Sequence, residues 1–246
     1  MNRRDMISLL GGSAALFAVS QSEGFAQQQP GRRAQREQGA PRGGAPRNQR
    51  GERTLTQYPN EHFYKNGKFD EEVARAAYKE MFDFHRYSIR ESVLNSKDFW
   101  VLEFALDDFS HVGMAGIFFV NDKDHGYFGH EIYLLPGQMI AEHRHIPAEG
   151  KPAKHECWQV RNGQIWTFAS GGTAADVPSD VTLPKSQDGS ITAFQVKKLE
   201  VGDMDYLSAL EAPHFMMAGP QGAIVTEYAS YHSGDGLRFT NPKAKA

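Results

Sequence analysis

The apolar residues of this chain are distributed unevenly, and their spacing divides the chain into three stretches. Residues 6–20 are mostly apolar, residues 27–53 contain no aliphatic side chain larger than Ala, and from Leu55 onward apolar residues recur in short patterned runs. Only the third stretch has both the apolar content and the periodicity that a hydrophobic core requires. We therefore expect one folded domain over residues 55–246.

Helical spacing occurs only near the start of this domain. Four apolar residues recur there at intervals of three or four: Val73, Ala77, Met81 and Phe84. Residues 70–72 are all acidic, and acidic side chains are favoured in the first turn of a helix by the helix dipole. The pattern predicts a helix over residues 70–85, and we expect a second, shorter helix over residues 88–94.

From residue 99 to the end, short runs rich in aromatic and β-branched residues alternate with Gly, Asp, Asn and Pro. Nine runs are predicted as strands: 99–104, 116–120, 127–135, 139–145, 155–160, 164–168, 191–199, 204–207 and 223–231. No helical pattern separates them, and this is typical of an antiparallel barrel or sandwich. We predict an all-β domain, a jelly-roll barrel with a small helical N-terminal cap.

The formal net charge of -3 is an average over two unlike parts. Nine Lys/Arg and four Asp/Glu fall in residues 1–53, so the totals of 27 and 30 leave 18 and 26 in residues 54–246, a net charge of -8 there. A nucleic-acid groove needs clustered Lys and Arg to replace the counterions of the phosphates. The acidic domain therefore argues against nucleic acid as a partner.

Residues 1–26 have the pattern of an export signal. A charged start, an apolar stretch over residues 6–20 and a small-residue end are typical of a secretory signal peptide, and the apolar stretch is short for a transmembrane helix, which needs ~20 residues. Arg3 and Arg4 resemble the start of a twin-arginine signal. We expect export to the periplasm by that route, with no stable membrane span after processing. An uncleaved membrane anchor is the alternative.

Residues 27–54 are rich in Arg, Gly, Pro and Gln, and seven of them are Arg. Such a segment has almost no apolar surface to bury, so we predict a disordered linker. A solubilising linker is the favoured interpretation, and a basic tether to an anionic surface is the alternative.

Residue types that bind metals are concentrated in residues 141–163. His143 and His145 lie two positions apart on a predicted strand, where alternate side chains share a face, so both imidazoles point the same way. Glu156 follows eleven residues later, and His214 comes directly after a proline. The four residues together predict a metal site with three imidazole ligands and one carboxylate ligand. The alternative is a set of surface histidines beside a solvated Glu.

Mixed nitrogen and oxygen donors suit Mn²⁺, Fe²⁺, Co²⁺, Ni²⁺ or Zn²⁺, and an octahedral ion keeps positions open for substrate or water. A zinc site built from cysteines is excluded, because Cys157 is the only cysteine and its side chain is predicted to lie on the face opposite Glu156. The remaining histidines lack this arrangement and are expected to be structural or exposed: His62, His85, His111, His125, His130, His155 and His232.

Two charged residues are predicted inside the barrel. Lys154 shares a strand face with Glu156, and Glu227 lies in the strand AIVTEYAS among apolar neighbours. A buried unpaired carboxylate is costly, so we expect Lys154 and Glu227 to pair beside the metal site and to supply an acid and a base. A salt bridge at the rim of the barrel is the alternative.

These residues resemble the D-lyxose isomerase family of metal-dependent cupins. The matches are E-H-x-H at residues 142–145, the G-K…K-x-E run that ends at Lys154 and Glu156, the Pro-His pair at His214, and the segment VTEYASYHSGDGLRFTNP. The resemblance covers about residues 70–243. It implies that the barrel is of the cupin type.

The resemblance also implies roles for individual residues. Manganese would be bound by His143, His145, Glu156 and His214. Lys154 and Glu227 would transfer protons in an aldose–ketose isomerisation of the D-lyxose to D-xylulose type through a cis-enediolate, and Arg238 would contact the sugar. We expect Trp158 to line the pocket, because aromatic faces pack against the C–H surfaces of sugars.

Several properties stay open at the level of the sequence. They are the sugar, the physiological metal, the division of acid and base roles, and the oligomeric state, for which a homodimer is one option. The polar connection over residues 170–189 departs from the family pattern, and we expect it to change the opening of the site.

Two other functions compete with the isomerase. An Fe²⁺-dependent cupin dioxygenase would use the same four ligands and would have an apolar or aromatic pocket, but it gives Lys154 and Glu227 no task. A non-catalytic exported cupin that binds a sugar would show stoichiometric binding without turnover, because a fold does not determine a function.

Overall fold

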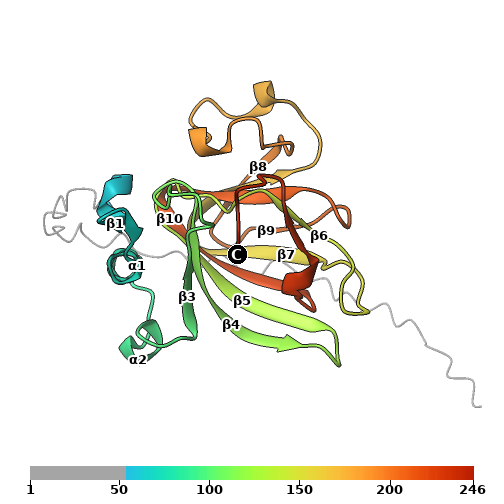
Figure 1. The fold of residues 1–246 in the computed structure, drawn as a ribbon, viewed down its shortest axis with the longest axis horizontal. Helices are drawn as coiled ribbons and strands as arrows, with labels where there is room; N and C mark the ends of the chain where they lie inside the picture. The colour runs from blue at the N-terminus through green and yellow to red at the C-terminus, as the bar shows by residue number, and fades with distance from the viewer. Residues whose placement is uncertain (1–53) are drawn as a thin grey trace, which may run out of the picture. The chain divides into compact units, whose positions relative to one another are not determined.

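The computed structural model describes residues 54–246. The predicted signal peptide, residues 1–26, and all but the last residue of the predicted linker, residues 27–54, lie outside the described residues. Within residues 54–246, a small helical segment precedes one curled antiparallel sheet (Figure 1). In this part of the chain, no helix combines the length and the apolar character that crossing a membrane requires.

The N-terminal segment forms the cap. Its elements are η1 (Asn60–Phe63), β1 (Tyr64–Lys65), β2 (Lys68–Phe69), α1 (Glu71–His85) and α2 (Glu91–Leu94). The helix α1 begins where the side chain of Asp70 accepts a hydrogen bond from the backbone N–H of Val73, and it ends at Arg86, whose φ of 56° is left-handed. The predicted helix over residues 70–85 is thus confirmed, whereas the second helix is shorter than predicted.

Nine strands form the main sheet. They are β3 (Phe99–Leu102), β4 (Met114–Asp122), β5 (Tyr127–Leu134), β6 (His143–His145), β7 (Glu156–Ala169), β8 (Gln195–Glu200), β9 (Met204–Tyr206), β10 (His214–Ser230) and β11 (Leu237–Phe239). Three short 3₁₀ helices lie in the connections: η2 (Ala174–Asp176), η3 (Lys185–Gln187) and η4 (Gly234–Gly236). The strand order is β11-β6-β10-β5-β4-β3, and β7 pairs with β10, β8 and β9.

The two faces of the sheet belong to different hydrophobic clusters. On β5, Ile132 and Leu134 face the barrel interior, whereas Tyr133 faces the cap and packs at 4.7 Å from the ring of Phe82 in α1. Burial of a side chain such as Phe82 contributes roughly 1.5–3 kcal/mol, so the cap stabilises the outer face of the sheet. The predicted architecture, an all-β cupin-type jelly-roll barrel with a small helical N-terminal cap, is confirmed.

The boundaries of several strands differ from the predicted ones, because glycines that look like breaks lie inside strands. Gly163, at a φ of 72°, lies within β7, which joins the predicted runs 155–160 and 164–168 into one strand. Similarly, β10 begins at His214 and continues through Gly222, rather than beginning at residue 223. Strand β11 was not predicted, and only His143–His145 of the predicted run 139–145 is a strand.

The register of β10 places the functional side chains. His214 lies opposite His143 of β6, and Glu227 lies opposite both Trp158 of β7 and His130 of β5. Side chains directly opposite one another in an antiparallel pair lie on the same face of the sheet. The long strand β10 therefore brings two groups of polar residues to the interior of the barrel.

Candidate active site

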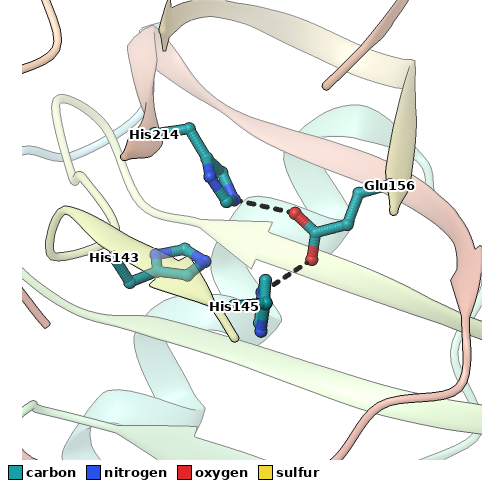
Figure 2. A group of neighbouring side chains, drawn as sticks. All are labelled: His143, His145, Glu156 and His214. Carbon is teal, nitrogen blue, oxygen red and sulfur yellow. Dashed lines mark ion pairs between the residues drawn. The ribbon is translucent and has the colours of Figure 1, made fainter. Parts of the chain in front are cut away.

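Three histidines and one glutamate converge inside the barrel (Figure 2). One ligand atom from each of His143, His145, Glu156 and His214 lies within 4.8 Å of the others. Nε2 of His145 lies 3.0 Å from Oε1 of Glu156, and Nε2 of His214 lies 2.7 Å from Oε2 of the same carboxylate. The structure thus brings together all four residues that the sequence predicted as metal ligands.

Backbone carbonyls fix the orientation of two of these rings. Nδ1 of His143 donates to the carbonyl of Ala141 at 3.0 Å, and Nδ1 of His214 donates to the carbonyl of Ala212 at 2.9 Å. A hydrogen bond at Nδ1 leaves the lone pair of Nε2 free and directs it toward the shared centre. This arrangement is common for histidines that bind metals.

The donor atoms fit a divalent cation. Nε2 of His145, Nε2 of His214 and Oε2 of Glu156 are buried, and the contacts that they make are the ion-pair contacts within the group, without well-aligned hydrogen bonds to other described residues. A divalent cation shared by these atoms would satisfy all of them at once. Burial raises the pKa of Glu156, but the charges of Lys154, His214 and His145 and the contact from His145 together outweigh burial and hold the pKa well below its usual range, which favours the ionised carboxylate. Burial lowers the pKa of His143 well below its usual value, which keeps that ring neutral for metal binding.

Lys154 and Glu227 form a buried ion pair beside this group. Nζ of Lys154 contacts Oε1 of Glu227 and lies 2.7 Å from Oε1 of Glu156. Lys154 and Glu227 are 5% and 4% exposed, so the pair is inside the barrel and not at its rim. The ammonium also lies 4.4 Å from the ring centroid of Phe128, a cation–π contact. The predicted contact between the two charged residues is confirmed.

The pKa shifts of both members of the pair favour their charged forms. Burial lowers the pKa of Lys154, but the carboxylates of Glu156 and Glu227 outweigh burial and raise it overall. Burial and the Glu156 charge raise the pKa of Glu227, but Lys154 and His130 outweigh them and lower it overall. The site therefore presents an ammonium and a carboxylate side by side.

Trp158 lines the same cavity, as predicted, and it also contacts the ion pair. Its indole is 5% exposed, and Nε1 donates to Oε2 of Glu227 at 3.3 Å. This hydrogen bond and the ion pair to Lys154 engage different oxygens of Glu227. Trp158 thereby helps to hold the carboxylate in one orientation.

Two histidines that are not predicted as site residues also line the cavity: His130 and His232. His130 is 5% exposed, and its Nε2 lies 3.1 Å from Oε2 of Glu227. His232 packs against Phe128 with a ring separation of 5.3 Å. The expectation of a structural or exposed position is therefore corrected for His130, which contacts Glu227, whereas the packing of His232 against Phe128 agrees with a structural role. The signal for His130 is its alternation with Phe128 on β5, which puts both on the inner face.

The structure does not bring Arg238 to the cavity. Its side chain is exposed and donates to the backbone carbonyls of Asp235 and Leu237, at 2.8 and 2.7 Å. Leu237 and Phe239 on the same strand line the cavity, so Arg238 points to the opposite face. The expectation that Arg238 contacts a ligand of this cavity is corrected, since its side chain lies on the face of β11 that points away from the cavity.

The cavity has a volume of about 250 Å³, and most side chains that line it are aliphatic or aromatic. No residue of the connection 170–189 is among them, so the predicted effect of this connection on the site is not seen in the described residues. Cys157 is half-buried and, as predicted, lies outside the cavity.

Comparison with known proteins identifies sugar isomerases among the relatives of this chain. No family model matches the chain. The D-lyxose/D-mannose isomerase of Thermosediminibacter oceani is 31% identical over 145 residues, which are 59% of this chain and 77% of that protein. The D-lyxose ketol-isomerase of Cohnella laeviribosi is 30% identical over 172 residues, 70% of this chain and 91% of that protein.

Solved structures support the fold. The L-ribose isomerase of Acinetobacter sp. DL28 in complex with L-ribose has a TM-score of 0.53 at 18% identity, over 71% of this chain and 92% of that chain. The L-ribose isomerase of Cellulomonas parahominis with L-ribose has a TM-score of 0.52 at 16% identity, over 69% and 90%. At these identities the likeness concerns the fold alone. The identity and coverage of the two sequence relatives, however, show that the chain belongs to the D-lyxose isomerase family.

Proposed function

We propose that the protein is a divalent-metal-dependent isomerase that interconverts an aldose and a ketose, with a D-lyxose-like sugar as substrate and a D-xylulose-like sugar as product. The observation that supports this proposal is the contact between the buried Lys154–Glu227 ion pair and the three-histidine, one-glutamate group at Glu156. Isomerisation through a cis-enediolate needs both a proton carrier and a stabilised oxyanion, and these neighbouring groups provide both.

We propose manganese as the metal, held by His143, His145, Glu156 and His214; Fe²⁺, Co²⁺, Ni²⁺ and Zn²⁺ suit the same donors. When bound, the ion supplies Lewis-acid polarisation of the sugar carbonyl. Metal analysis of the purified protein, before and after dialysis against a chelator, identifies the ion. Binding of a divalent ion at one equivalent per chain is the expected result.

We assign the base to Glu227 and the acid to Lys154. The Glu227 carboxylate removes the proton from the carbon beside the carbonyl, and the electron pair of the C–H bond forms the enediolate double bond. The same carboxylate returns a proton to the former carbonyl carbon. The Lys154 ammonium donates a proton to the former carbonyl oxygen and takes up the proton of the neighbouring hydroxyl as that oxygen becomes the new carbonyl, so both residues end in their starting protonation states. The contacts of Glu227 with Lys154, Trp158 and His130 hold its carboxylate in place for both steps.

The experiment that tests this function is an aldose panel assayed with the Mn²⁺-loaded protein in deuterium oxide. We expect a ketose product that carries solvent deuterium at the carbon that accepts the proton. The Glu227→Gln variant should retain the metal and lose nearly all activity. Retained activity in this variant would remove Glu227 from the role of base, and the absence of any ketose from the wild type would contradict the isomerase.

One observation favours a second candidate function. The wall of the cavity is mostly apolar and aromatic, as expected for an Fe²⁺-dependent dioxygenase of the same fold. Oxygen consumption by the Fe²⁺-loaded protein in the presence of an aromatic substrate would support that function. The isomerase remains the better proposal, because the buried Lys154–Glu227 pair has no task in oxygen chemistry. Stoichiometric sugar binding without turnover would instead favour a non-catalytic sugar-binding cupin.

We also propose that the protein is exported to the periplasm by the twin-arginine route, on the basis of the sequence of residues 1–26. Replacement of Arg3 and Arg4 by Lys keeps the charge of this segment and removes the arginine pair. Cell fractionation should then find the wild type in the periplasm and the Lys variant retained in the cytoplasm. Equal distribution of the two proteins would argue against this route.

A further inference from the structure

A pair of neighbouring rings in the cavity wall carries unpaired polar atoms. Nε1 of Trp100 and Nδ1 of His130 are shielded from solvent and have no hydrogen bond to any described residue. Both residues line the cavity, and neither belongs to the proposed metal ligands. Buried indole N–H groups and imidazole nitrogens usually have a partner, because the loss of water without a replacement is unfavourable. The described residues supply none, which leaves this role to the contents of the cavity.

The two rings lie against each other. Their centroids are 6.1 Å apart, and their planes are inclined by 20°. Trp100 of β3 lies opposite Gly116 of β4, where a Cβ atom would be only 2.4 Å from Cζ2 of the indole. Glycine at this position therefore leaves room for the indole against the backbone of β4, next to His130 of β5.

The two unpaired atoms are complementary to a hydroxyl group. The indole N–H of Trp100 can only donate a hydrogen bond. Nε2 of His130 lies 3.1 Å from Oε2 of Glu227, and the carboxylate favours a proton on Nε2, so in the neutral ring Nδ1 is an acceptor. A hydroxyl group accepts one hydrogen bond and donates another at the same time. One hydroxyl group thus offers what both atoms lack.

The ring pair lies beyond the ion pair as seen from the proposed metal ligands. Contacts lead from Glu156 to Lys154 at 2.7 Å, from Lys154 to Glu227, and from Glu227 to His130 at 3.1 Å. The ring of Trp100 follows at the end of this series. A sugar whose two reacting carbons are at the metal ligands and the ion pair therefore reaches the ring pair with a hydroxyl group of a later carbon.

We propose that Trp100 and His130 form a subsite that holds one hydroxyl group of the aldose beyond its two reacting carbons. Nε1 of Trp100 donates to the hydroxyl oxygen, and Nδ1 of His130 accepts from the hydroxyl O–H. This inference rests on the proposed function for the position of the carbonyl end. A site built to bind a substrate hydroxyl discriminates against the analogue that lacks it, because the polar groups of the site are then left unpaired. The subsite therefore determines which sugars the enzyme accepts.

The test combines the Trp100→Phe variant, which keeps an aromatic ring and removes the N–H group, with D-lyxose and its 3-, 4- and 5-deoxy analogues. The ratio of kcat/KM between the Mn²⁺-loaded wild type and variant, taken for one sugar at a time, cancels the intrinsic reactivity of that sugar. We expect the variant to lose about tenfold with D-lyxose and with two analogues. It should lose nothing with the analogue that lacks the bound hydroxyl. An equal loss with every sugar, or no loss with any, would overturn the inference.

Two further variants separate the subsite from a general effect on the fold. Trp166 is 4% exposed and does not line the cavity, so Trp166→Phe removes the same N–H group elsewhere and should keep the wild-type kcat/KM with every sugar. Gly116→Ala keeps the indole N–H but displaces the ring, so it should lose activity with the same sugars as Trp100→Phe. An unchanged kcat/KM in Gly116→Ala would count against the subsite.

Binding measurements distinguish failure of this inference from failure of the proposed function. Calorimetric titration of the Mn²⁺-loaded proteins with the same four sugars reports affinity without turnover. If the wild type isomerises none of them, the proposed function fails, and the comparison is made on Kd. Weaker binding of D-lyxose by Trp100→Phe, together with an unchanged Kd for one analogue, would then support the subsite. Equal changes for all four sugars, or no binding by the wild type, would overturn it.

Discussion

Nε2 of His130 lies 3.1 Å from Oε2 of Glu227, and the two residues lie directly opposite each other on neighbouring strands. Trp158 donates to the same carboxylate oxygen, and Lys154 pairs with the other. His130 is therefore a positioning residue for the proposed base, because it contacts Glu227 and none of the four proposed metal ligands in the described structure.

We expect the His130→Phe variant to lower kcat about tenfold or more, since it removes the 3.1 Å contact of Nε2 with Oε2 of Glu227, and a polar contact to a charged group contributes about 1.5–3 kcal/mol. The metal content should not change. Steady-state kinetics together with metal analysis measure both quantities. His125→Phe, at an exposed position, is the control and should behave as the wild type. An unchanged kcat in His130→Phe would mean that Glu227 does not need this contact.

The charge of Lys154 should be essential for stability as well as for activity. Lys154→Met leaves the carboxylates of Glu156 and Glu227 buried without their cation, and loss of one partner of a buried ion pair costs about 3–5 kcal/mol. Urea denaturation of the metal-free protein measures this cost. The double variant Lys154→Met/Glu227→Gln should recover part of it. Lys197→Met, which removes an exposed pair with Asp205, should cost less than about 1 kcal/mol.

Removal of the metal should lower stability without unfolding the protein. The two hydrophobic clusters of the domain are built mainly from side chains outside the metal-ligand group, so the metal-free chain retains a core. Metal at 100 times its Kd stabilises the folded state by about 2.7 kcal/mol. Thermal unfolding with and without Mn²⁺ tests this, and the shift should vanish in Glu156→Gln. A metal-free protein without cooperative unfolding would contradict the expectation.

The proposed metal ligands could be predicted from the sequence because strand alternation is a local property. His143 and His145 share a face of β6 whatever this strand pairs with, whereas Lys154 precedes β7 by two residues and contacts Glu156 from outside the strand. The positions of other residues depend on pairing that a sequence pattern does not specify. His130 contacts Glu227 only because of the register between β5 and β10, so its role became visible only in the structure.

The other incorrect predictions concern the ends of strands. Arg238 lies on β11, a strand of three residues that is too short for a periodic pattern, and its outward direction follows from the pairing of Arg238 with Arg144. Gly163 and Gly222 look like strand breaks in the sequence, although both lie within strands, near the register shifts between β7 and β10. The predicted fold class is nevertheless correct, because it depends on the number and type of secondary-structure elements more than on where each element ends.

Glu142 should hold the segment after β7 against the strand that carries His143. Its buried carboxylate accepts hydrogen bonds from Thr192 N, Ala193 N, Thr192 Oγ1 and Thr240 Oγ1, at 2.8, 2.9, 2.7 and 2.7 Å. The Glu142→Gln variant replaces one carboxylate oxygen by an NH2 group, which cannot accept hydrogen bonds from these donors. We therefore expect the free energy of unfolding to fall by about 3 kcal/mol. Chemical denaturation measures the loss. Glu61→Gln, at an exposed position, should be close to neutral, and equal stability of the two variants would contradict this role.

Gly163 should be the most sensitive glycine of the central strands. A Cβ atom at this position would lie 2.0 Å from the carbonyl oxygen of Gly222, and the φ of 72° is left-handed. Gly163→Ala must therefore push β7 away from β10, and we expect a loss of more than about 3 kcal/mol in denaturant unfolding. Gly67 has the same φ of 72° with no atom within 4 Å of a Cβ, so Gly67→Ala measures only the cost of a left-handed backbone for a residue with a side chain, about 1 kcal/mol.

The two glycine variants should also differ in activity. Strands β7 and β10 carry Glu156, Trp158, His214 and Glu227, so the Gly163 variant should lose activity, whereas the Gly67 variant should not. Similar losses of stability in the two variants would show that the close approach of the strands is not what requires glycine.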